Sequence, residues 1–227
     1  MERTRPRCAE GRASQCYRGR IGYTVKLADV YRDVCVPLER ALHHPVVIAG
    51  GAPRDHLLGR RPRDYDVFIL AGKLGPPMVN KVCKDARAVC TLIAHADGEL
   101  VTASSGKYDG PKVSPIAQWD WRGTHIQVMY TPHKDVTSLL ASFDWNICCA
   151  AYADGVYTKL PVWNTKVLTL VSTPQYPLVT LRRGYEFSNR YSMKLEDHTA
   201  RTLCKQVATE KIDAIFDFLG SVSGYVQ

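Results

Sequence analysis

Apolar and polar residues in the first half of the chain switch between a helical and a strand-like pattern. Over residues 25–42 apolar side chains recur every three or four positions, which predicts a helix that ends at His43-His44-Pro45. Residues 46–49 form a short continuous apolar run, which is typical of a buried strand. Further along, the pattern predicts a strand over 64–71, a helix over 78–90 and a strand over 91–94.

The second half of the chain carries two hairpin signals and then becomes helical. Arg122-Gly123 separates two apolar segments, and so does Asp154-Gly155, which predicts hairpins over 116–130 and 147–160. A helix is predicted over 133–143, between the hairpins. Beyond residue 174 two helical periods follow, carried by Leu178, Leu181, Tyr185 and Tyr191 and then by Leu203, Val207, Ile212, Ile215, Phe216 and Leu219.

The composition is that of an ordinary globular chain. It has 227 residues, of which 45% are hydrophobic and 23% charged, enough to bury a sizeable core. No run approaches the roughly 18 apolar residues that a membrane helix needs, so we expect no membrane segment, and we see no secretory signal. Residues 1–20 hold six arginines and predict a flexible basic arm, which is either a nucleic-acid contact or a tail without a role.

Charge and cysteine usage narrow the partners and the compartment. Lys and Arg number 30 against 22 for Asp and Glu, a formal charge of +8, which favours RNA, DNA or nucleotides as partners. The eight cysteines include no C-x-x-C pair. We therefore expect free thiols in a reducing compartment, and hence a cytoplasmic protein.

Residues 50–59 predict a phosphate-binding turn. The buried strand ends at Gly50-Gly51, and two glycines permit a tight turn that a ligand can approach closely. Pro53 suits the first turn of a helix, whose free N–H groups bind anions. Arg54 adds a fixed positive charge, and Gly59 suits the end of a two-turn helix.

Asp64 and Asp66 open the next strand and predict a metal site. Strand side chains alternate, so both carboxylates share one face while Tyr65 points away. Nearby carboxylates repel each other unless a cation lies between them, and Mg²⁺ or Mn²⁺ prefers such oxygen ligands together with substrate phosphates. A phosphate turn beside this pair indicates transfer of a nucleotidyl group from an NTP. Two metals would activate the attacking hydroxyl and stabilise the departing pyrophosphate.

The segment 50–66 resembles the first motif of the class II tRNA CCA-adding enzymes and bacterial poly(A) polymerases, G-G-x-x-R-D-x-L-L-G-x-x-x-x-D-x-D. These enzymes belong to the DNA polymerase β-like nucleotidyltransferase superfamily. Segment 144–152 is similar to the family's R-R-D-F-T-I-N-A-L-A-Y from its Asp onward, and segment 177–190 to E-D-P-L-R-x-L-R-A-x-R-F-A-x-R-L-G-F. The short length resembles members carried by tailed bacteriophages, which would place the protein in the host cytoplasm.

The resemblance implies a fold and a domain division. We expect an α/β nucleotidyltransferase head over 21–170, with a small mixed β-sheet flanked by helices. A short helical neck would follow over 171–227, without the long body with which the family grips tRNA.

Departures from the family pattern alter the expected site. Gln127 stands where the family has its third carboxylate, so we expect a weak metal ligand there, or else another acid such as Asp144 or Glu99. Tyr176 and Val179 stand where the family's Asp and Arg pair with the incoming base. Without those hydrogen bonds we expect weak base selectivity.

The predicted site residues follow from the motifs and the resemblance together. Asp64 and Asp66 are the expected catalytic residues and metal ligands, with Gln127 as a weak third ligand. The nucleotide-binding candidates are Gly50, Gly51, Arg54, Asp55, Arg63, Asp144 and Arg182, and the nucleic-acid-binding candidates, placed on a helix, are Arg183, Arg190 and Lys194.

Three functions stay open at this point. The first is a Mg²⁺-dependent enzyme that transfers NMP from an NTP to a hydroxyl, at an RNA 3′ end. The second is a non-catalytic module of the same fold that binds nucleotide or RNA. The third is the same transfer to a protein or a small molecule.

Overall fold

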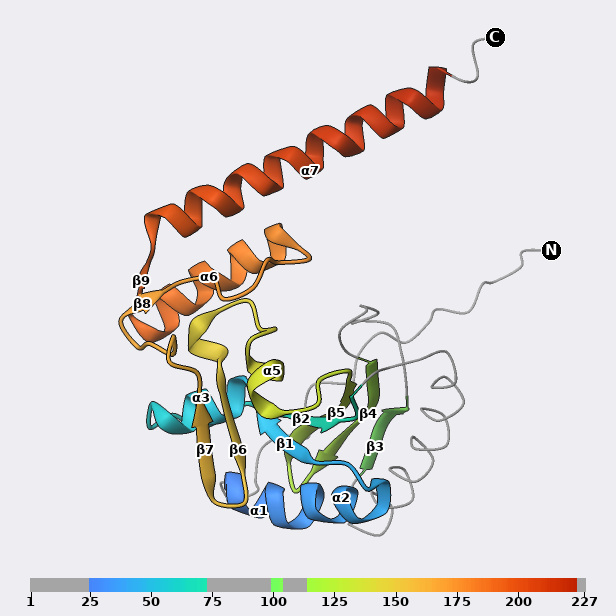
Figure 1. Cartoon of the computed structure of the whole chain (residues 1–227), viewed down its shortest axis with the longest axis vertical. Helices are drawn as coiled ribbons and strands as arrows, with labels where there is room; N and C mark the ends of the chain where they lie inside the picture. The colour runs from blue at the N-terminus through green and yellow to red at the C-terminus, as the bar shows by residue number, and fades with distance from the viewer. Residues whose placement is uncertain (1–24, 73–98, 104–113, 224–227) are drawn as a thin grey trace, which may run out of the picture.

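The computed structural model describes residues 25–72, 99–103 and 114–223. The predicted basic arm, the helix over 78–90 and the strand over 91–94 lie outside these ranges. The predicted small mixed sheet is confirmed: seven strands pair in the order β3-β4-β5-β2-β1-β6-β7, and of these pairs β2 with β5 is parallel (Figure 1). The strands are β1 (Val46–Ala49), β2 (Asp64–Leu70), β3 (Glu99–Ala103), β4 (Ser114–Trp121), β5 (Thr124–Thr131), β6 (Ala150–Ala153) and β7 (Val156–Lys159).

Both predicted hairpins are present. Arg122 and Gly123 have φ values of 52° and 72°, and Asp154 and Gly155 have values of 45° and 79°. Two successive left-handed residues fit the twist of the flanking strands. The second hairpin differs at its start, because a short 3-10 helix, η2 (Asn146–Cys148), replaces the strand predicted from residue 147. The Asn146 side chain fixes this turn by hydrogen bonding to the backbone around residues 147, 162, 167 and 169.

One face of the sheet is covered by the N-terminal helical segment. The helix predicted over 25–42 is present as α1 (Leu27–Val30), a π-helical turn η1 (Tyr31–Cys35) and α2 (Val36–Leu42). Pro37 lies at the start of α2, and a proline supplies no N–H to the helical ladder, which accounts for the widened turn before it. The first core cluster forms here and includes Val30, Leu38, Val67 and Val128.

The opposite face of the sheet holds a second core cluster around α5 (Val136–Leu140). This helix is shorter than the prediction over 133–143. Asp135 caps its first turn by accepting a hydrogen bond from the Ser138 N–H at 2.8 Å, which fixes where the helix begins. Short turn contacts at Ser142 and Phe143 then end it.

The C-terminal segment is largely helical, as predicted. It contains α6 (Pro177–Tyr191) and α7 (Asp197–Ser223), and a third core cluster with Trp145, Ile147, Met193 and Leu203 packs α6 and α7 against the rest of the chain (Figure 1). Lys194 is an exception to the helix prediction. It lies in the two-residue strand β9 (Lys194–Leu195), which pairs with β8 (Val167–Leu168). The boundary between head and neck at residue 170 stays a prediction.

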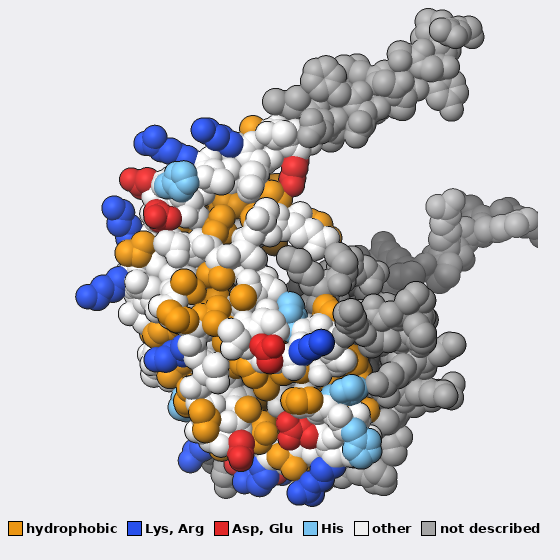
Figure 2. All heavy atoms as spheres, in the orientation of Figure 1, with side chains coloured by type: hydrophobic (Ala, Val, Ile, Leu, Met, Phe, Trp, Pro, Cys, Tyr) orange, Lys and Arg blue, Asp and Glu red, His pale blue; other side chains and the backbone are white. Residues whose placement is uncertain are grey.

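None of the described helices is long and apolar enough to cross a bilayer. In the space-filling view, Lys and Arg side chains gather at the upper left, over the β8–β9 end of α6 and α7, and again at the bottom over α1 and α2 (Figure 2).

Candidate active site

The glycine turn brings three chemical groups to one point. Gly50 has a φ of 77° and leads into α3 (Gly51–Leu57), a left-handed conformation that other residues adopt only with strain. A Cβ on Gly51 would lie 3.6 Å from Arg54 Nη2 and 3.8 Å from Asp64 Oδ1. The turn, an arginine and the first carboxylate of the predicted metal pair are therefore neighbours.

The two aspartates at the start of β2 share one side of the sheet. Tyr65 between them is 1% exposed in the core and donates its hydroxyl to the Val25 carbonyl at 2.7 Å, so the alternation predicted from the sequence is correct. Asp64 is exposed and Asp66 is partly buried. Burial, together with the nearby Asp64 carboxylate, raises the pKa of Asp66 to about 7, and Arg183 and Arg54 offset only part of this.

Gln127 lies next to this pair. β2 and β5 run in parallel with Asp66 beside Gln127. The Gln127 side chain is 8% exposed, and its Nε2 has no hydrogen-bond partner in the part of the chain that the structure describes. Its role as a third metal ligand stays a prediction.

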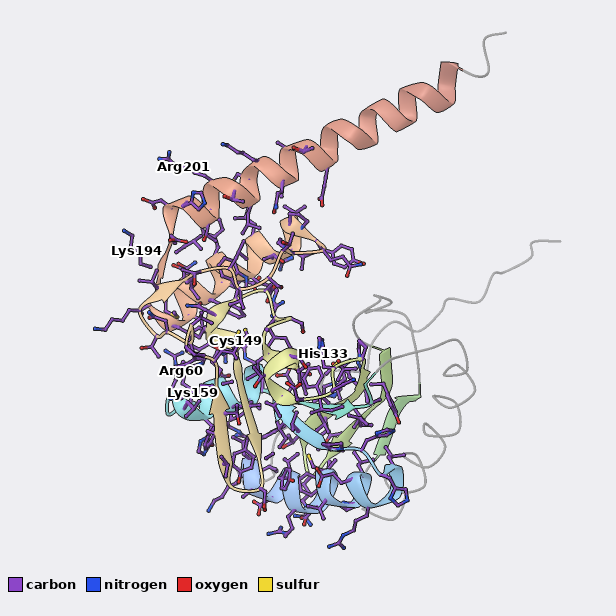
Figure 3. All side chains as sticks on the ribbon, in the orientation of Figure 1. Arg60, His133, Cys149, Lys159, Lys194 and Arg201 are labelled. Carbon is purple, nitrogen blue, oxygen red and sulfur yellow. The ribbon has the colours of Figure 1, made fainter. Side chains whose placement is uncertain are left out.

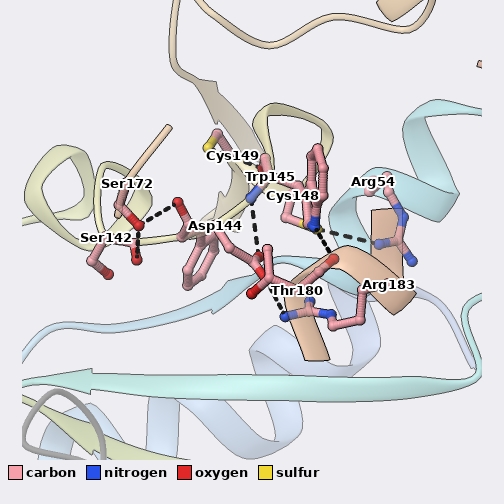
Figure 4. Close-up of polar contacts among 10 residues, drawn as sticks. Arg54, Ser142, Asp144, Trp145, Cys148, Cys149, Ser172, Thr180 and Arg183 are labelled. Atoms are coloured by element: carbon pink, nitrogen blue, oxygen red, sulfur yellow. Dashed lines mark hydrogen bonds and ion pairs between the residues drawn. The ribbon is translucent and has the colours of Figure 1, made fainter. Parts of the chain in front are cut away.

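Asp144 and Arg183 connect α6 to this centre (Figure 4). Arg183 Nη1 donates to Asp144 Oδ2 at 2.7 Å, and Thr180 Oγ1 donates to the same oxygen at 3.3 Å. The Trp145 N–H donates to the other oxygen, Asp144 Oδ1, at 3.0 Å. Asp144 thus acts on the site by holding Arg183, whose charge reaches Asp66.

A second, buried set of contacts joins α3 to the end of α6. Asp55 is 2% exposed and accepts hydrogen bonds from Arg54 Nε at 2.9 Å, Arg190 Nη2 at 3.0 Å and the Tyr191 hydroxyl at 2.6 Å. The Arg54 guanidinium lies over the rings of Phe187 and Tyr191, 4.9 Å and 4.8 Å from their centroids. These contacts, the Asp55 clamp, give Asp55 and Arg190 a structural role that the motifs did not indicate. Contact of Asp55 with a nucleotide, and of Arg190 with nucleic acid, stays a prediction.

The two adjacent arginines of α6, Arg182 and Arg183, pair with different partners, and their predicted ligand contacts stay predictions. Arg182, a candidate nucleotide contact, has a side chain 81% exposed that pairs with Glu186 at 2.9 Å on the outer face of the helix. Arg183, a candidate nucleic-acid contact, faces the carboxylates instead. Arg63 lies exposed immediately before Asp64. Its predicted contact with the nucleotide stays untested.

Exposed basic side chains follow one edge of the molecule, from β7 up to α7. Arg60, Lys159, Lys194 and Arg201 are all exposed and lie along this edge (Figure 3). The Arg60 guanidinium also lies over the Tyr191 ring at 5.0 Å, and the Lys159 ammonium over the Trp163 ring at 4.8 Å. The edge contains Lys194, which the sequence analysis proposed for nucleic acid. The line of four residues as a whole could not be foreseen, because its members come from a loop and three separate elements.

Two further residues shape the site and were missed. Cys148 accepts a hydrogen bond from Arg54 Nη1 at 3.5 Å and so steadies that guanidinium (Figure 4). Gly184 lets α6 approach the buried Trp145, whose Nε1 donates to the Thr180 carbonyl at 3.1 Å. An isolated glycine within a helical pattern was the available signal for this close approach.

The donor set fits a hard divalent cation. Two carboxylates on one sheet face, one of them desolvated and repelled by the other, form an oxygen site that Mg²⁺ or Mn²⁺ would stabilise. Among the described residues no cluster of three or more His, Cys, Asp or Glu side chains is placed to hold a metal. The carboxylate pair therefore lacks a third acidic partner within that part of the chain.

Comparison with protein-family models found no match, and comparison with curated protein sequences found none either. Solved structures do match. A CCA-adding enzyme in complex with CTP aligns with a TM-score of 0.57 at 17% identity, over 80% of this chain and 43% of that one. The Thermotoga maritima CCA-adding enzyme complexed with tRNA aligns with a TM-score of 0.54 at 19% identity, over 78% of this chain and 41% of that one.

A tRNA nucleotidyltransferase complexed with a primer tRNA and an incoming ATP analogue gives a TM-score of 0.52 at 16% identity, over 76% of this chain and 49% of that one. The mixed sheet and its helices therefore have the nucleotidyltransferase head fold of CCA-adding enzymes. The chain spans less than half the length of each of these three proteins.

Proposed function

We propose that this chain is a metal-dependent nucleotidyltransferase that transfers NMP from an NTP to a hydroxyl acceptor at an RNA 3′ end and releases pyrophosphate. The observation that carries the proposal is the meeting of Gly51, Arg54 and Asp64 at one point, with Asp66 on the same sheet face. The fold adds support, since solved proteins with this head fold are described with CTP, ATP and tRNA.

Each residue has a part that follows from its position. Gly50 and Gly51 present bare backbone to the triphosphate, and the Arg54 guanidinium beside them supplies positive charge. Arg183, held by Asp144, adds a second positive charge on the α6 side. Asp64 and Asp66 would hold the divalent cation, which supplies charge neutralisation for the phosphates and a lower pKa for the attacking hydroxyl.

An RNA acceptor is suggested by the exposed basic residues along one edge of the molecule, Arg60, Lys159, Lys194 and Arg201. A line of exposed cations tracks a phosphodiester backbone without reading its sequence. The exposed Tyr176 and Val179, at 58% and 55%, offer the base an apolar surface with at most one hydroxyl. Such a surface discriminates weakly between bases.

A second candidate is a module that binds nucleotide without turnover. The neutral Gln127, next to Asp66 where an acid would strengthen the metal site, favours it. An assay of NMP transfer distinguishes the two candidates, because a module that only binds nucleotide attaches no NMP to an acceptor.

The test supplies each of the four NTPs with label at the α-phosphate, Mg²⁺ or Mn²⁺, and either total RNA or total protein. We expect label in RNA, from at least one purine and one pyrimidine NTP, with efficiencies within about two orders of magnitude. Label in protein would show that the acceptor is a protein and not RNA. Nucleotide binding without label transfer would favour the second candidate, a module that binds nucleotide without turnover. A clean preference for CTP followed by ATP would contradict weak base selectivity.

A further inference from the structure

Gln127 lies on the face of the sheet that carries Asp66. The parallel pairing of β2 and β5 places the two residues side by side, and paired residues project from the same face with their Cβ atoms about 5 Å apart. Ile126 and Val128, on either side of Gln127, are fully buried in the core on the other face. The Gln127 amide therefore belongs to the carboxylate site rather than to the core of α1 and α2.

The amide of Gln127 is buried, and its N–H donor is not hydrogen-bonded to any described residue. The side chain is 8% exposed, and Nε2 has no hydrogen-bond partner among the residues that the structure describes. A buried donor without an acceptor lowers stability, so folded proteins seldom keep one without a reason. Next to a phosphate and cation site, an acceptor oxygen of a bound ligand would satisfy this donor.

Of the two described acids that the sequence analysis offered in place of a third carboxylate, neither Glu99 nor Asp144 compensates for the neutral side chain at this position. Along the sheet, Asp64 pairs with His125, His125 with Asp120, and Asp120 with Glu99. Three strand spacings put the Glu99 backbone about 14 Å from that of Asp64, out of reach. Asp144, the other acid that the sequence offered, has both oxygens occupied by Arg183, Thr180 and the Trp145 N–H.

This count of charges limits the number of cations. One Mg²⁺ is commonly held by one or two carboxylates together with substrate phosphates. A second cation about 4 Å away would have to share the same two carboxylates, with the neutral Gln127 on the open side. The two-metal site expected from the sequence therefore has too little negative charge among the described residues.

We propose that the centre holds a single divalent cation on Asp64 and Asp66, and that the Gln127 side chain donates an N–H to a phosphate oxygen of the bound nucleotide. The proposal rests on the proposed function, because it assumes that a nucleotide binds at this pair. A glutamine suits this place, since its N–H attracts a phosphate oxygen that a third carboxylate would repel.

The experiment measures cation and nucleotide binding separately on the full chain. Mn²⁺ is counted by electron paramagnetic resonance, and α,β-methylene-ATP, which cannot be transferred, is titrated by calorimetry. Gln127→Met keeps the side-chain length and removes the donor. Gln118→Met is the matched control, since Gln118 pairs with Gln127 one strand further from Asp66.

We expect one Mn²⁺ per wild-type chain in the presence of the analogue. Gln127→Met should bind the analogue about 10- to 100-fold more weakly, the effect of one hydrogen bond to a charged acceptor. It should bind Mn²⁺ alone as the wild type does. Its apo form should unfold at the same or a higher temperature, because the lost group had no partner. Gln118→Met should bind the analogue as the wild type does.

Two results would overturn the inference: unchanged analogue affinity in Gln127→Met, or two Mn²⁺ ions per wild-type chain. Asp66→Asn separates this from the proposed function. If it loses Mn²⁺ while Gln127→Met matches the wild type, only the inference fails. If Asp66→Asn keeps both Mn²⁺ and analogue, the proposed function fails.

Discussion

Gly184 sets how closely α6 approaches the site, and replacing it with alanine should displace that helix. A Cβ on Gly184 would lie 2.7 Å from Cη2 of Trp145, 3.2 Å from Cε2, and closer still to Cζ2. Carbon atoms in contact normally stay about 3.5–4.0 Å apart. Trp145 cannot withdraw, because it is fully buried and its Nε1 is hydrogen-bonded to the Thr180 carbonyl. The helix must therefore move by about 1 Å.

The expected effect on stability combines two opposing contributions. Overpacking a well-filled core costs about 1–3 kcal/mol, whereas alanine gains about 1 kcal/mol over glycine in a helix. We expect Gly184→Ala to lower the free energy of unfolding by up to about 2 kcal/mol in urea titrations. Arg183 would shift with the helix, and a displacement of about 1 Å can reduce turnover by about 100-fold.

Two comparisons make this prediction specific. Asn189→Ala, on the exposed side of the same helix, should leave stability and transfer unchanged or slightly raised. In a Trp145→Phe background, where the clashing ring atoms are gone, the additional loss from Gly184→Ala should shrink by at least about 1 kcal/mol. Equal stability and equal transfer in Gly184→Ala and Asn189→Ala would show that Gly184 does not set the position of α6.

Two further predictions concern the carboxylates. Since the folded-state pKa of Asp66 is raised to about 7, its stabilising contribution is complete below the ordinary pKa near 4 and is lost as the pH rises through 7. Asp66→Asn should therefore stabilise the apo chain by about 2–4 kcal/mol at pH 8 and little at pH 4, as measured by urea unfolding. The same variant should abolish transfer. An equal gain in stability at both pH values would show that the raised pKa of Asp66 is not the cause. Asp55→Asn should cost about 3–5 kcal/mol, because it leaves the buried Arg54 and the partly buried Arg190 without their carboxylate. Glu186→Gln, which breaks the exposed pair with Arg182, should cost less than about 0.5 kcal/mol, and equal losses in the two variants would show that the Asp55 clamp does not hold α6.

Local patterns were sufficient to predict much of the fold. Alternation at Asp64, Tyr65 and Asp66 depends only on strand geometry, and the left-handed turns at 122–123 and 154–155 depend on two residues each. The glycine turn beside a carboxylate pair could be read from spacing along a single stretch of chain. These features are encoded by near neighbours, so the sequence alone indicated them.

Contacts between distant segments could not be predicted in the same way. Whether Arg182 or Arg183 faces the site depends on how α6 is rotated against Trp145, and that rotation is set by Gly184 packing across the third core cluster. The burial of Asp55 depends on Arg190 and Tyr191, more than a hundred residues away. No periodicity within α3 reports on such a partner.

The fate of the two ends of the triphosphate shows whether this chain transfers NMP and releases pyrophosphate. The chain is incubated with Mg²⁺, RNA and ATP labelled at either the α- or the γ-phosphate, alongside Asp64→Asn as the matched inactive variant. We expect α-label to enter the RNA, γ-label to leave as pyrophosphate, and Asp64→Asn to show neither. Transfer of γ-label to the acceptor, or undiminished α-label transfer by Asp64→Asn, would contradict this expectation.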